Sequence, residues 1–507
     1  MKFLVIILYI FVYSLQLISQ DSKQITEKYF SDFDIDMKTP AFEKKRGFTE
    51  YDEMISYLNN IKSNYPDNFS YEYIGKSQKG KKIPMVYLGN PLNSNIKVCF
   101  MAGVHGNEPA STEGMLFLIN NLLKEDSISH LLKNLNIAII PMVNIDGCQK
   151  HSRYAANGKD LNRDFTKVTN PETRYLLKAI NKFSPDVIVD FHEYKPYRAD
   201  FVNFGDFGST SLFDCMFLYS GNLNVCSQIK KTIEDLYLPN AKKSLDHYDL
   251  RYHNYLSSKN KDNKVYFNLG SVSPRSSATS FALGNNISIL MEIRGVGLNR
   301  NSFKRRIFTT YLLAISFLET SSRNSVFVKS EINKCGTFPN DIVIKYSKEK
   351  TNYKLDMIDV YNNETISVDI FLHNGLKCNS KVKRQRPKYY IIESDLNIVA
   401  EKLKILGLEV ESLKYDELLE VESYQVVSNR KSLDSFQGDH ENIVNVELIT
   451  ENILFKKGTF IVSMAQKKSN LAVETLEPEM LSGFLRYNII QPSEINKIHR
   501  YLLNKDL

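Results

Sequence analysis

The sequence predicts an α/β fold with a mixed, mostly parallel central sheet flanked by helices, plus smaller C-terminal β and α+β modules. Short apolar runs alternate with segments of helical periodicity over the first 318 residues, which is typical of a mostly parallel sheet. After residue 324 this alternation gives way to strand-like runs. At ~150 residues per domain, the chain of 507 residues is long enough for two to four domains.

The elements of the first part follow in order. A helix begins near Thr49, where Met54, Leu58 and Ile61 repeat at helical spacing. A β-hairpin joins two strand-like runs, and the alternation then continues to residue 318. The predicted strands are residues 71–74, 83–88, 96–101, 137–143, 187–191 and 287–293, and the later helices are residues 109–123, 171–183 and 307–318. Between these strands, residues 200–286 lose the pattern, and we expect long loops with one helix near residues 226–236.

We place a domain boundary at residues 321–324, where the helical spacing ends at Ser-Ser-Arg-Asn. The predicted division is a signal segment over 1–20, an α/β domain over 21–324, a small β unit over 325–383 and an α+β module over 384–507. Within the β unit we expect strands at 326–328, 353–360 and 366–372, and we interpret the basic segment 381–388 as a linker.

The composition excludes several classes of protein. It is 43% hydrophobic and 24% charged, which is ordinary for a globular protein and unlike collagen, disordered chains or multi-span membrane proteins. The formal net charge of +7 is spread along the chain. We therefore expect no nucleic-acid partner, because such a partner requires a concentrated basic face.

The N-terminus predicts export. Lys2 precedes the apolar run 3–13, and a polar stretch reaches Asp21, as in a secretory signal. A membrane anchor is the alternative, but the run is shorter than the ~20 residues of a spanning helix. We expect a secreted or periplasmic protein with no membrane span. Export permits disulfides; Cys215 and Cys226 are close enough in sequence to pair, although the six cysteines leave the pairing open.

Polar side chains that can bind a ligand follow four predicted strands. They are His105 with Glu108, then residues 144–147, then His192, and finally Glu292. Ligands of open α/β sheets bind beyond the carboxyl ends of the strands. His105 and Glu108 are three residues apart in a Gly-containing turn, so both can reach one point. With His192 they would form the two-histidine, one-carboxylate set typical of catalytic zinc with an open position for water.

With these residues identified, the segment from about Phe48 to Leu318 resembles the zinc metallocarboxypeptidases of the carboxypeptidase A type. Residues 105–108 (His-Gly-Asn-Glu) resemble the first ligand motif of that family, and residues 190–192 (Asp-Phe-His) resemble the strand of its third ligand. Residues 160–165 (Asp-Leu-Asn-Arg-Asp-Phe) are similar to its substrate-anchoring motif, and residues 291–294 (Met-Glu-Ile-Arg) to the strand with its catalytic glutamate. The resemblance implies a carboxypeptidase-like fold and one Zn²⁺ per chain.

The resemblance also implies a role for each site residue. Glu292 would take the proton of the attacking water and return it to the leaving amine, and Arg153 would stabilise the developing oxyanion. Asn162 and Arg163 would hold the terminal carboxylate of the substrate. Asp160 would hydrogen-bond the far nitrogen of the first histidine ligand and fix its tautomer.

The chain departs from the family pattern in one respect. The family supplies a tyrosine from a loop before the glutamate, and no tyrosine aligns there. Tyr248, Tyr252, Tyr255 and Tyr266 are candidates that structural roles also explain, and Arg275 is an alternative substrate contact. No residue identifies the preferred C-terminal side chain of the substrate.

Three functions are compatible with these residues. The first is a secreted zinc carboxypeptidase that hydrolyses the C-terminal peptide bond of a peptide with a free carboxylate. The second is a zinc amidohydrolase that acts on N-acyl amino acids or peptidoglycan stem peptides. The third is a catalytically inactive peptide-binding protein, which the presence of Glu292 beside all three ligands argues against. The segment from Tyr389 onward is similar to the tail of large secreted bacterial members of the family, and the oligomeric state stays open.

Overall fold

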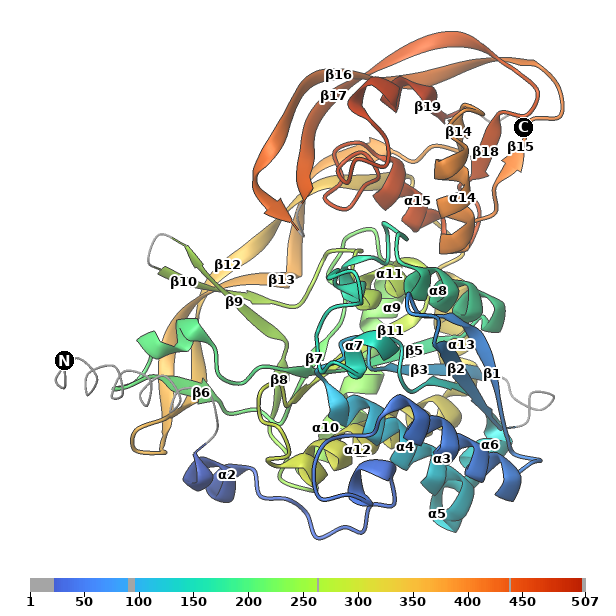
Figure 1. Ribbon diagram of the computed structural model, residues 1–507. Helices are drawn as coiled ribbons and strands as arrows, with labels where there is room; N and C mark the ends of the chain where they lie inside the picture. The colour runs from blue at the N-terminus through green and yellow to red at the C-terminus, as the bar shows by residue number, and fades with distance from the viewer. Residues whose placement is uncertain (1–21, 90–95, 262–263, 437–438, 504–507) are drawn as a thin grey trace, which may run out of the picture.

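The structure, a computed structural model, describes residues 22–89, 96–261, 264–436 and 439–503; the predicted signal segment, residues 1–20, lies outside them. The described strands form sheets of eight, five and six strands. In Figure 1 the eight-stranded sheet lies in the lower half of the molecule between two groups of helices, and the six-stranded sheet lies above it.

The eight-stranded sheet confirms the predicted fold class. Its four central strands, β4, β3, β5 and β11, are mutually parallel, whereas β1 and β2 form an antiparallel hairpin at one edge and β7 runs antiparallel to β11. The central strands are almost wholly buried, as expected for a sheet covered on both faces. In spatial order the strands are β1 (Phe69–Lys76), β2 (Lys82–Leu88), β4 (Leu135–Ile140), β3 (Ile96–Ala102), β5 (Val187–Tyr194), β11 (Ile287–Arg294), β7 (Cys215–Leu218) and β8 (Tyr252–Asn254).

Helices cover both faces of this sheet. α4 (Pro109–Lys124) and α12 (Phe303–Arg323) pack on one face, and α8 (Pro171–Phe183) and α11 (Ser277–Leu283) pack on the other (Figure 1). α3 (Tyr51–Asn64) lies near the β1 edge. The shorter helical segments of this half are α2 (Lys23–Tyr29), η1 (Pro40–Phe42), α5 (Asp126–Ser129), α6 (Leu131–Asn134), α7 (Ile145–Cys148), η2 (Leu161–Arg163), η3 (Ala199–Asn203), α9 (Ser227–Thr232), η4 (Ile233–Tyr237), α10 (Leu238–Asp246) and α13 (Ser325–Lys334).

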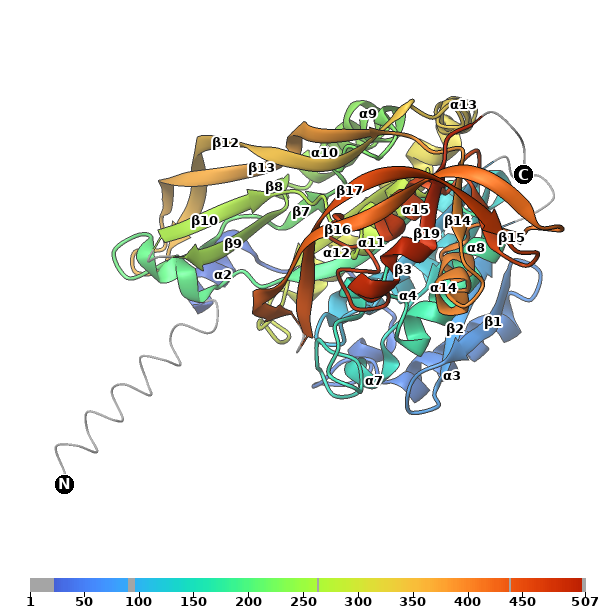
Figure 2. The same cartoon turned by 90° about the horizontal axis from the view of Figure 1, so that it is seen from above.

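The five-stranded sheet joins segments from both sides of the predicted boundary near residue 324. Its long hairpin pairs in parallel with β10 and antiparallel with β6, so the stretch expected to be mostly loop contains strands. Figure 2 shows the hairpin lying alongside β9 and β10. The strands in spatial order are β6 (Ser209–Ser211), β12 (Asp341–Asp359), β13 (Thr365–Gln385), β10 (Lys264–Leu269) and β9 (Leu256–Lys261).

Two local predictions in this region are wrong. Residues 326–328 belong to helix α13 and not to a strand. Val328 and Ile332, four residues apart, are both buried on one helical face, and this packing outweighs the β-propensity of the short run. The basic segment 381–388 is not simply a linker, because β13 continues through Gln385 in register with β12.

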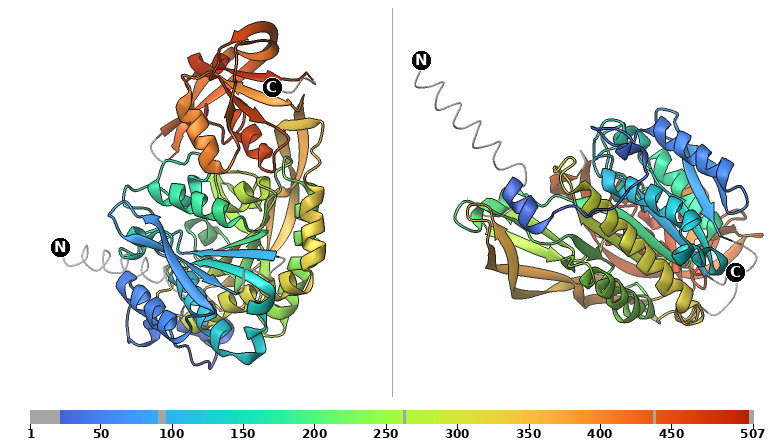
Figure 3. Two further views of the ribbon diagram at one scale, coloured as in Figure 1. Left: turned by 90° about the vertical axis from the view of Figure 1, so that its right-hand side faces the viewer. Right: turned by 90° about the horizontal axis from the view of Figure 1, so that it is seen from below.

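The six-stranded sheet belongs to the C-terminal module. Its helices α14 (Asn397–Leu406) and α15 (Ser469–Leu476) pack on α8 and α11, which joins the module to the α/β domain (Figure 3, left). α14 ends at Gly407, whose positive φ of 92° suits a helix C-terminus. The strands are β15 (Glu411–Ser412), β18 (Phe460–Ser463), β14 (Tyr389–Ile392), β19 (Ile498–Tyr501), β16 (Glu417–Phe436) and β17 (Asp439–Phe455), and a short helix, η5 (Pro492–Lys497), precedes β19.

A disulfide links Cys226, which precedes α9, to Cys335 at the end of α13. The alternative considered from the sequence, Cys215 with Cys226, is wrong because Cys215 is a buried free thiol in β7. None of the helices in the described part of the chain has the length and apolarity that a bilayer crossing requires.

The contact between the C-terminal module and the α/β domain contains a buried carboxyl group. Glu474 of α15 is 1% exposed, and its Oε1 accepts hydrogen bonds from Asn222 Nδ2 (2.7 Å) and Asn224 Nδ2 (3.1 Å). Burial raises the pKa of Glu474 to about 7, although both hydrogen bonds oppose the shift. The folded protein therefore keeps this proton to a higher pH than the unfolded chain does.

We predict that Glu474→Gln makes thermal stability less dependent on pH. The unfolded chain loses the Glu474 proton near pH 4.5 and the folded protein near pH 7, so stability falls as the pH rises through this window. The loss at pH 8 is at most about 3 kcal/mol. Apparent Tm values at pH 5 and pH 8 should differ less for the variant than for the wild type. Equal differences would contradict the assignment.

Candidate active site

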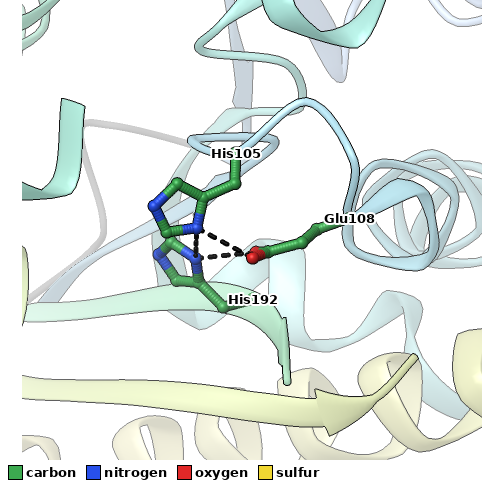
Figure 4. Close-up of side chains that lie close together, drawn as sticks. All are labelled: His105, Glu108 and His192. Atoms are coloured by element: carbon green, nitrogen blue, oxygen red, sulfur yellow. Dashed lines mark hydrogen bonds and ion pairs between the residues drawn. The ribbon is translucent and has the colours of Figure 1, made fainter. Parts of the chain in front are cut away.

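Three side chains meet at the carboxyl end of the central strands (Figure 4). His105 Nδ1 lies 2.8 Å from Glu108 Oε1, His192 Nδ1 lies 2.8 Å from Glu108 Oε2, and the two Nδ1 atoms are 3.0 Å apart. All three residues are at most 3% exposed. Each offers one ligand atom within 4.8 Å of the others, so the structure brings together the three residues that the sequence pattern selected.

The central sheet and one tight turn place these side chains. His105 follows β3, Glu108 directly precedes α4, and His192 lies on β5, which continues beyond the predicted end at Phe191. The turn needs Gly106, because a β-carbon there would lie 2.0 Å from the carbonyl carbon of Gly147. The predicted strand-end segment 144–147 therefore supports the turn that carries two of the three groups.

An aspartate lies at the far nitrogen of each histidine. His105 Nε2 is 3.0 Å from Asp160 Oδ1, as the resemblance implied, and His192 Nε2 is 2.9 Å from Asp190 Oδ2. No motif in the sequence indicated the second contact, although Asp190 and His192 are two residues apart and so share one face of β5. Both carboxylates favour a proton on Nε2, which turns the Nδ1 lone pair toward the common centre.

This donor set fits a zinc ion. Two neutral imidazole nitrogens and a carboxylate are all hydrogen-bond acceptors, and acceptors this close repel one another unless a cation lies between them. Two histidines and one glutamate with an open side toward a cavity are ligands of catalytic zinc.

Glu292 lies beside this centre. It is in register with His192 on the neighbouring strand, and both His105 and Glu292 line one cavity. Burial raises the pKa of Glu292 to about 7, and the negative charge of Glu108 acts in the same direction while His192 opposes it. A carboxyl with a pKa near neutrality can both accept and return a proton, which is what general acid–base catalysis requires.

Arg153 and Asn162 converge on Asp160. Arg153 donates from Nε (3.1 Å) and Nη2 (2.9 Å) to Asp160 Oδ2, and its Nη1 lies 3.5 Å from Glu108 Oε1. Asn162 donates its backbone N–H to Asp160 Oδ1 (2.8 Å), and its side-chain Oδ1 accepts the N–H of Ser277 (2.9 Å). The second contact leaves Asn162 Nδ2 as the amide donor available to a ligand.

Arg163 lines the same cavity. Its Nη1 donates to the backbone oxygen of Asn162 (2.7 Å), and it has no ion pair with a carboxylate among the described residues. Burial lowers the pKa of Arg163, with Arg275 and Arg153 adding to the effect and Asp160 opposing it. A guanidinium held among other cations in a cavity is suited to an anionic ligand.

The cavity has a volume of about 590 Å³, and its lining distinguishes the four candidate tyrosines. Tyr255 lines it near Glu292, and burial together with the charge of Glu292 raises the pKa of Tyr255 to about 12. Tyr266 lines a different hollow, Tyr248 packs on Phe308, and Tyr252 packs on Phe217. The wall also includes Arg275, and Lys348 of β12, which no motif in the sequence indicated.

The fold and the site together are those of a metallopeptidase, and comparisons with known proteins identify the family. The zinc carboxypeptidase family matches residues 54–199. Carboxypeptidase 2 of Trichophyton rubrum is 27% identical over 432 residues, which cover 82% of this chain and 79% of the relative. Human carboxypeptidase D is 29% identical over 164 residues, or 28% of this chain and 12% of the relative. The family match over residues 54–199 and the carboxypeptidase relatives together support a zinc metallocarboxypeptidase.

Similarity to solved structures is more distant. Carboxypeptidase A from Helicoverpa armigera covers 62% of this chain and 81% of its own length, with a TM-score of 0.43 and 16% identity. The relatives that align over four fifths of the chain, in Trichophyton species, are fungal and not bacterial. The bacterial affinity expected for the C-terminal segment is therefore not shown.

Proposed function

We propose that this protein is a secreted carboxypeptidase that holds one Zn²⁺ and removes the C-terminal residue of peptides. The observation that carries the proposal is the convergence of His105, Glu108 and His192 beside Glu292, in a cavity that also contains Arg163. The cavity thus contains both the groups for hydrolysis and a group for a carboxylate. An exported location agrees with the Cys226–Cys335 disulfide, because such bonds persist in oxidising compartments.

Zinc would be held by Nδ1 of His105, Nδ1 of His192 and the Glu108 carboxylate. Bound there, it supplies Lewis-acid chemistry, polarising a carbonyl and lowering the pKa of water. Asp160 holds the His105 ring by a hydrogen bond, and Asp190 Oδ2, 2.9 Å from Nε2 of His192, favours the tautomer that this ligand set needs.

Glu292 would move the proton of the reaction. As a carboxylate it takes a proton from the attacking water, and it then returns this proton to the nitrogen of the leaving amino acid. Its position in register with His192 supports this role, because a peptide that reached the metal site would bring its scissile bond close to Glu292.

Arg153 would stabilise the negative charge that develops on the carbonyl oxygen. Two of its nitrogens are held by Asp160, so the guanidinium is fixed before substrate binds, while Nη1 faces the metal ligand Glu108. Burial opposes its charge, but Asp160, Glu108 and Glu292 together raise the pKa of Arg153. A fixed charge of this kind needs no reorganisation during the reaction.

Asn162 and Arg163 would bind the terminal carboxylate of the peptide. The amide of Asn162 presents Nδ2, and the guanidinium of Arg163 presents a planar set of donors that matches a carboxylate. A peptide held there by its terminus would extend toward Glu292 and the metal ligands. This arrangement favours release of one residue from the end of the chain over cleavage within it.

We predict that Glu292→Gln abolishes turnover without loss of zinc. The amide is nearly isosteric but cannot take the proton, so kcat/KM should fall by about 10²–10⁴-fold on any good peptide. Zinc content, measured by elemental analysis of the purified variant, should stay near one per chain. Normal hydrolysis by this variant would show that another group moves the proton.

We also predict that amidation of the C-terminus of a peptide stops its cleavage. The amide removes the charge that Arg163 needs, and kcat/KM should fall about 100-fold or more. In Arg163→Ala the ratio between the free acid and the amide should approach one. Mass spectrometry of the products would check both results. Equal cleavage of acid and amide by the wild type would favour an endopeptidase or an N-acyl amidohydrolase.

A further inference from the structure

Lys348 brings a positive charge into the catalytic cavity from outside the α/β domain. It lies on β12, in the long hairpin, and lines the same cavity as Glu292 and Arg163. Its Nζ donates to the side-chain oxygen of Asn268 on β10 (3.2 Å), and Asn268 lines the cavity as well. An ammonium and an amide therefore stand side by side on this wall.

An irregularity in the hairpin fixes the position of Lys348. Lys348 pairs with Cys378, but the next residue, Glu349, pairs with Asn374, so residues 375–377 bulge out of β13. The bulge packs closely, because a β-carbon at Gly221 would lie 1.8 Å from the oxygen of Gly375. β-Bulges redirect side chains and are frequent beside active sites.

The bulge is also fixed from the side of the α/β domain. Lys230 Nζ donates to the backbone oxygen of Leu376 at 2.9 Å. A β-carbon at Gly270 would lie 2.7 Å from Leu376 Cδ2, and the positive φ of 67° at Gly270 already favours glycine there. The chain therefore holds the wall around Lys348 in one arrangement.

The ammonium of Lys348 has no acidic partner in the described part of the chain. Other lysines of the same hairpin do: Lys345 lies 2.7 Å from Glu479, and Lys377 lies 3.6 Å from Glu349. Burial lowers the pKa of Lys348, because no carboxylate near it offsets the desolvation. Burying an unpaired charge is unfavourable, so an unpaired lysine that faces a cavity points to an anionic ligand in that cavity.

The carboxylates that line the cavity do not pair with Lys348. Glu193 pairs with the buried Arg306 at 2.5 Å, and Glu292 stands beside the metal ligands. Asp356 also lines the cavity, but it is eight residues further along β12, or roughly 26 Å at 3.3 Å per residue. Lys348 therefore adds to the cavity wall a positive charge that none of these carboxylates pairs with.

We propose that Lys348 and Asn268 form a second anion-binding point in the catalytic cavity, which selects peptides with an acidic side chain among their last three residues. The inference rests on the proposed carboxypeptidase function, in which Asn162 and Arg163 take up the terminal carboxylate. A second carboxylate on the same peptide pairs with the ammonium of Lys348 and receives a hydrogen bond from the amide of Asn268.

The test compares peptides that differ only in Glu against Gln, placed in turn at each of the last three positions, all with a free C-terminus. The wild type should prefer Glu at one position by about 10-fold or more in kcat/KM. In Lys348→Met this ratio should fall to about one, and in Lys348→Arg it should persist. Because the ratio compares two peptides on one enzyme, a general loss of activity cancels.

Lys354→Met is the matched control, because Lys354 is exposed on the same strand and does not line the cavity. It should keep both the activity and the preference of the wild type. A wild-type ratio near one at all three positions, or a preference unchanged in Lys348→Met, would overturn the inference and leave the carboxypeptidase intact. If no peptide is cleaved at its C-terminus, the proposed function itself fails. Should Lys348→Met not fold, Lys348→Gln supplies a second neutral variant.

Discussion

The site depends on the close approach of three buried proton acceptors. Two imidazole nitrogens and a carboxylate lie within about 3 Å of one another, and an aspartate behind each ring directs the lone pair inward. Such groups separate in water, so the surrounding structure must hold them together. Parallel strands β3 and β5 bring the histidines together from 87 residues apart in sequence, and the turn at Gly106 brings in the glutamate. A divalent cation would convert this repulsion into attraction.

Local patterns predicted the parts of the fold that are determined locally. The hairpin of β1 and β2 and the four central parallel strands follow from apolar runs and turns that neighbouring residues define. Other features depend on distant partners. Val328 lies in a helix because of tertiary packing, and β13 continues to Gln385 because β12 extends beside it. The pairing of Cys226 with Cys335 spans 109 residues, and no spacing rule indicates it.

The same distinction holds for the site. The strand-end positions of His105, Glu108 and His192 were predictable because parallel strands end at one edge of a sheet. The contact of Asp190 with His192 could also have been predicted, because residues two apart on a strand lie on the same face of the sheet. The position of Lys348 was not predictable, because Lys348 reaches the cavity from a hairpin in another sheet, beside a bulge that packs against Gly221, Lys230 and Gly270. Its position follows from tertiary structure alone.

The most direct test of the account is zinc K-edge X-ray absorption on the purified full-length protein, with His105→Ala for comparison. Two nitrogen ligands and the remaining oxygen ligands should lie at about 2.0–2.2 Å, and the variant should lose the metal. The free thiol of Cys148, near Glu108, provides a sharp alternative. A sulfur ligand at about 2.3 Å, or a zinc-free protein that hydrolyses peptides normally, would contradict the proposed ligand set.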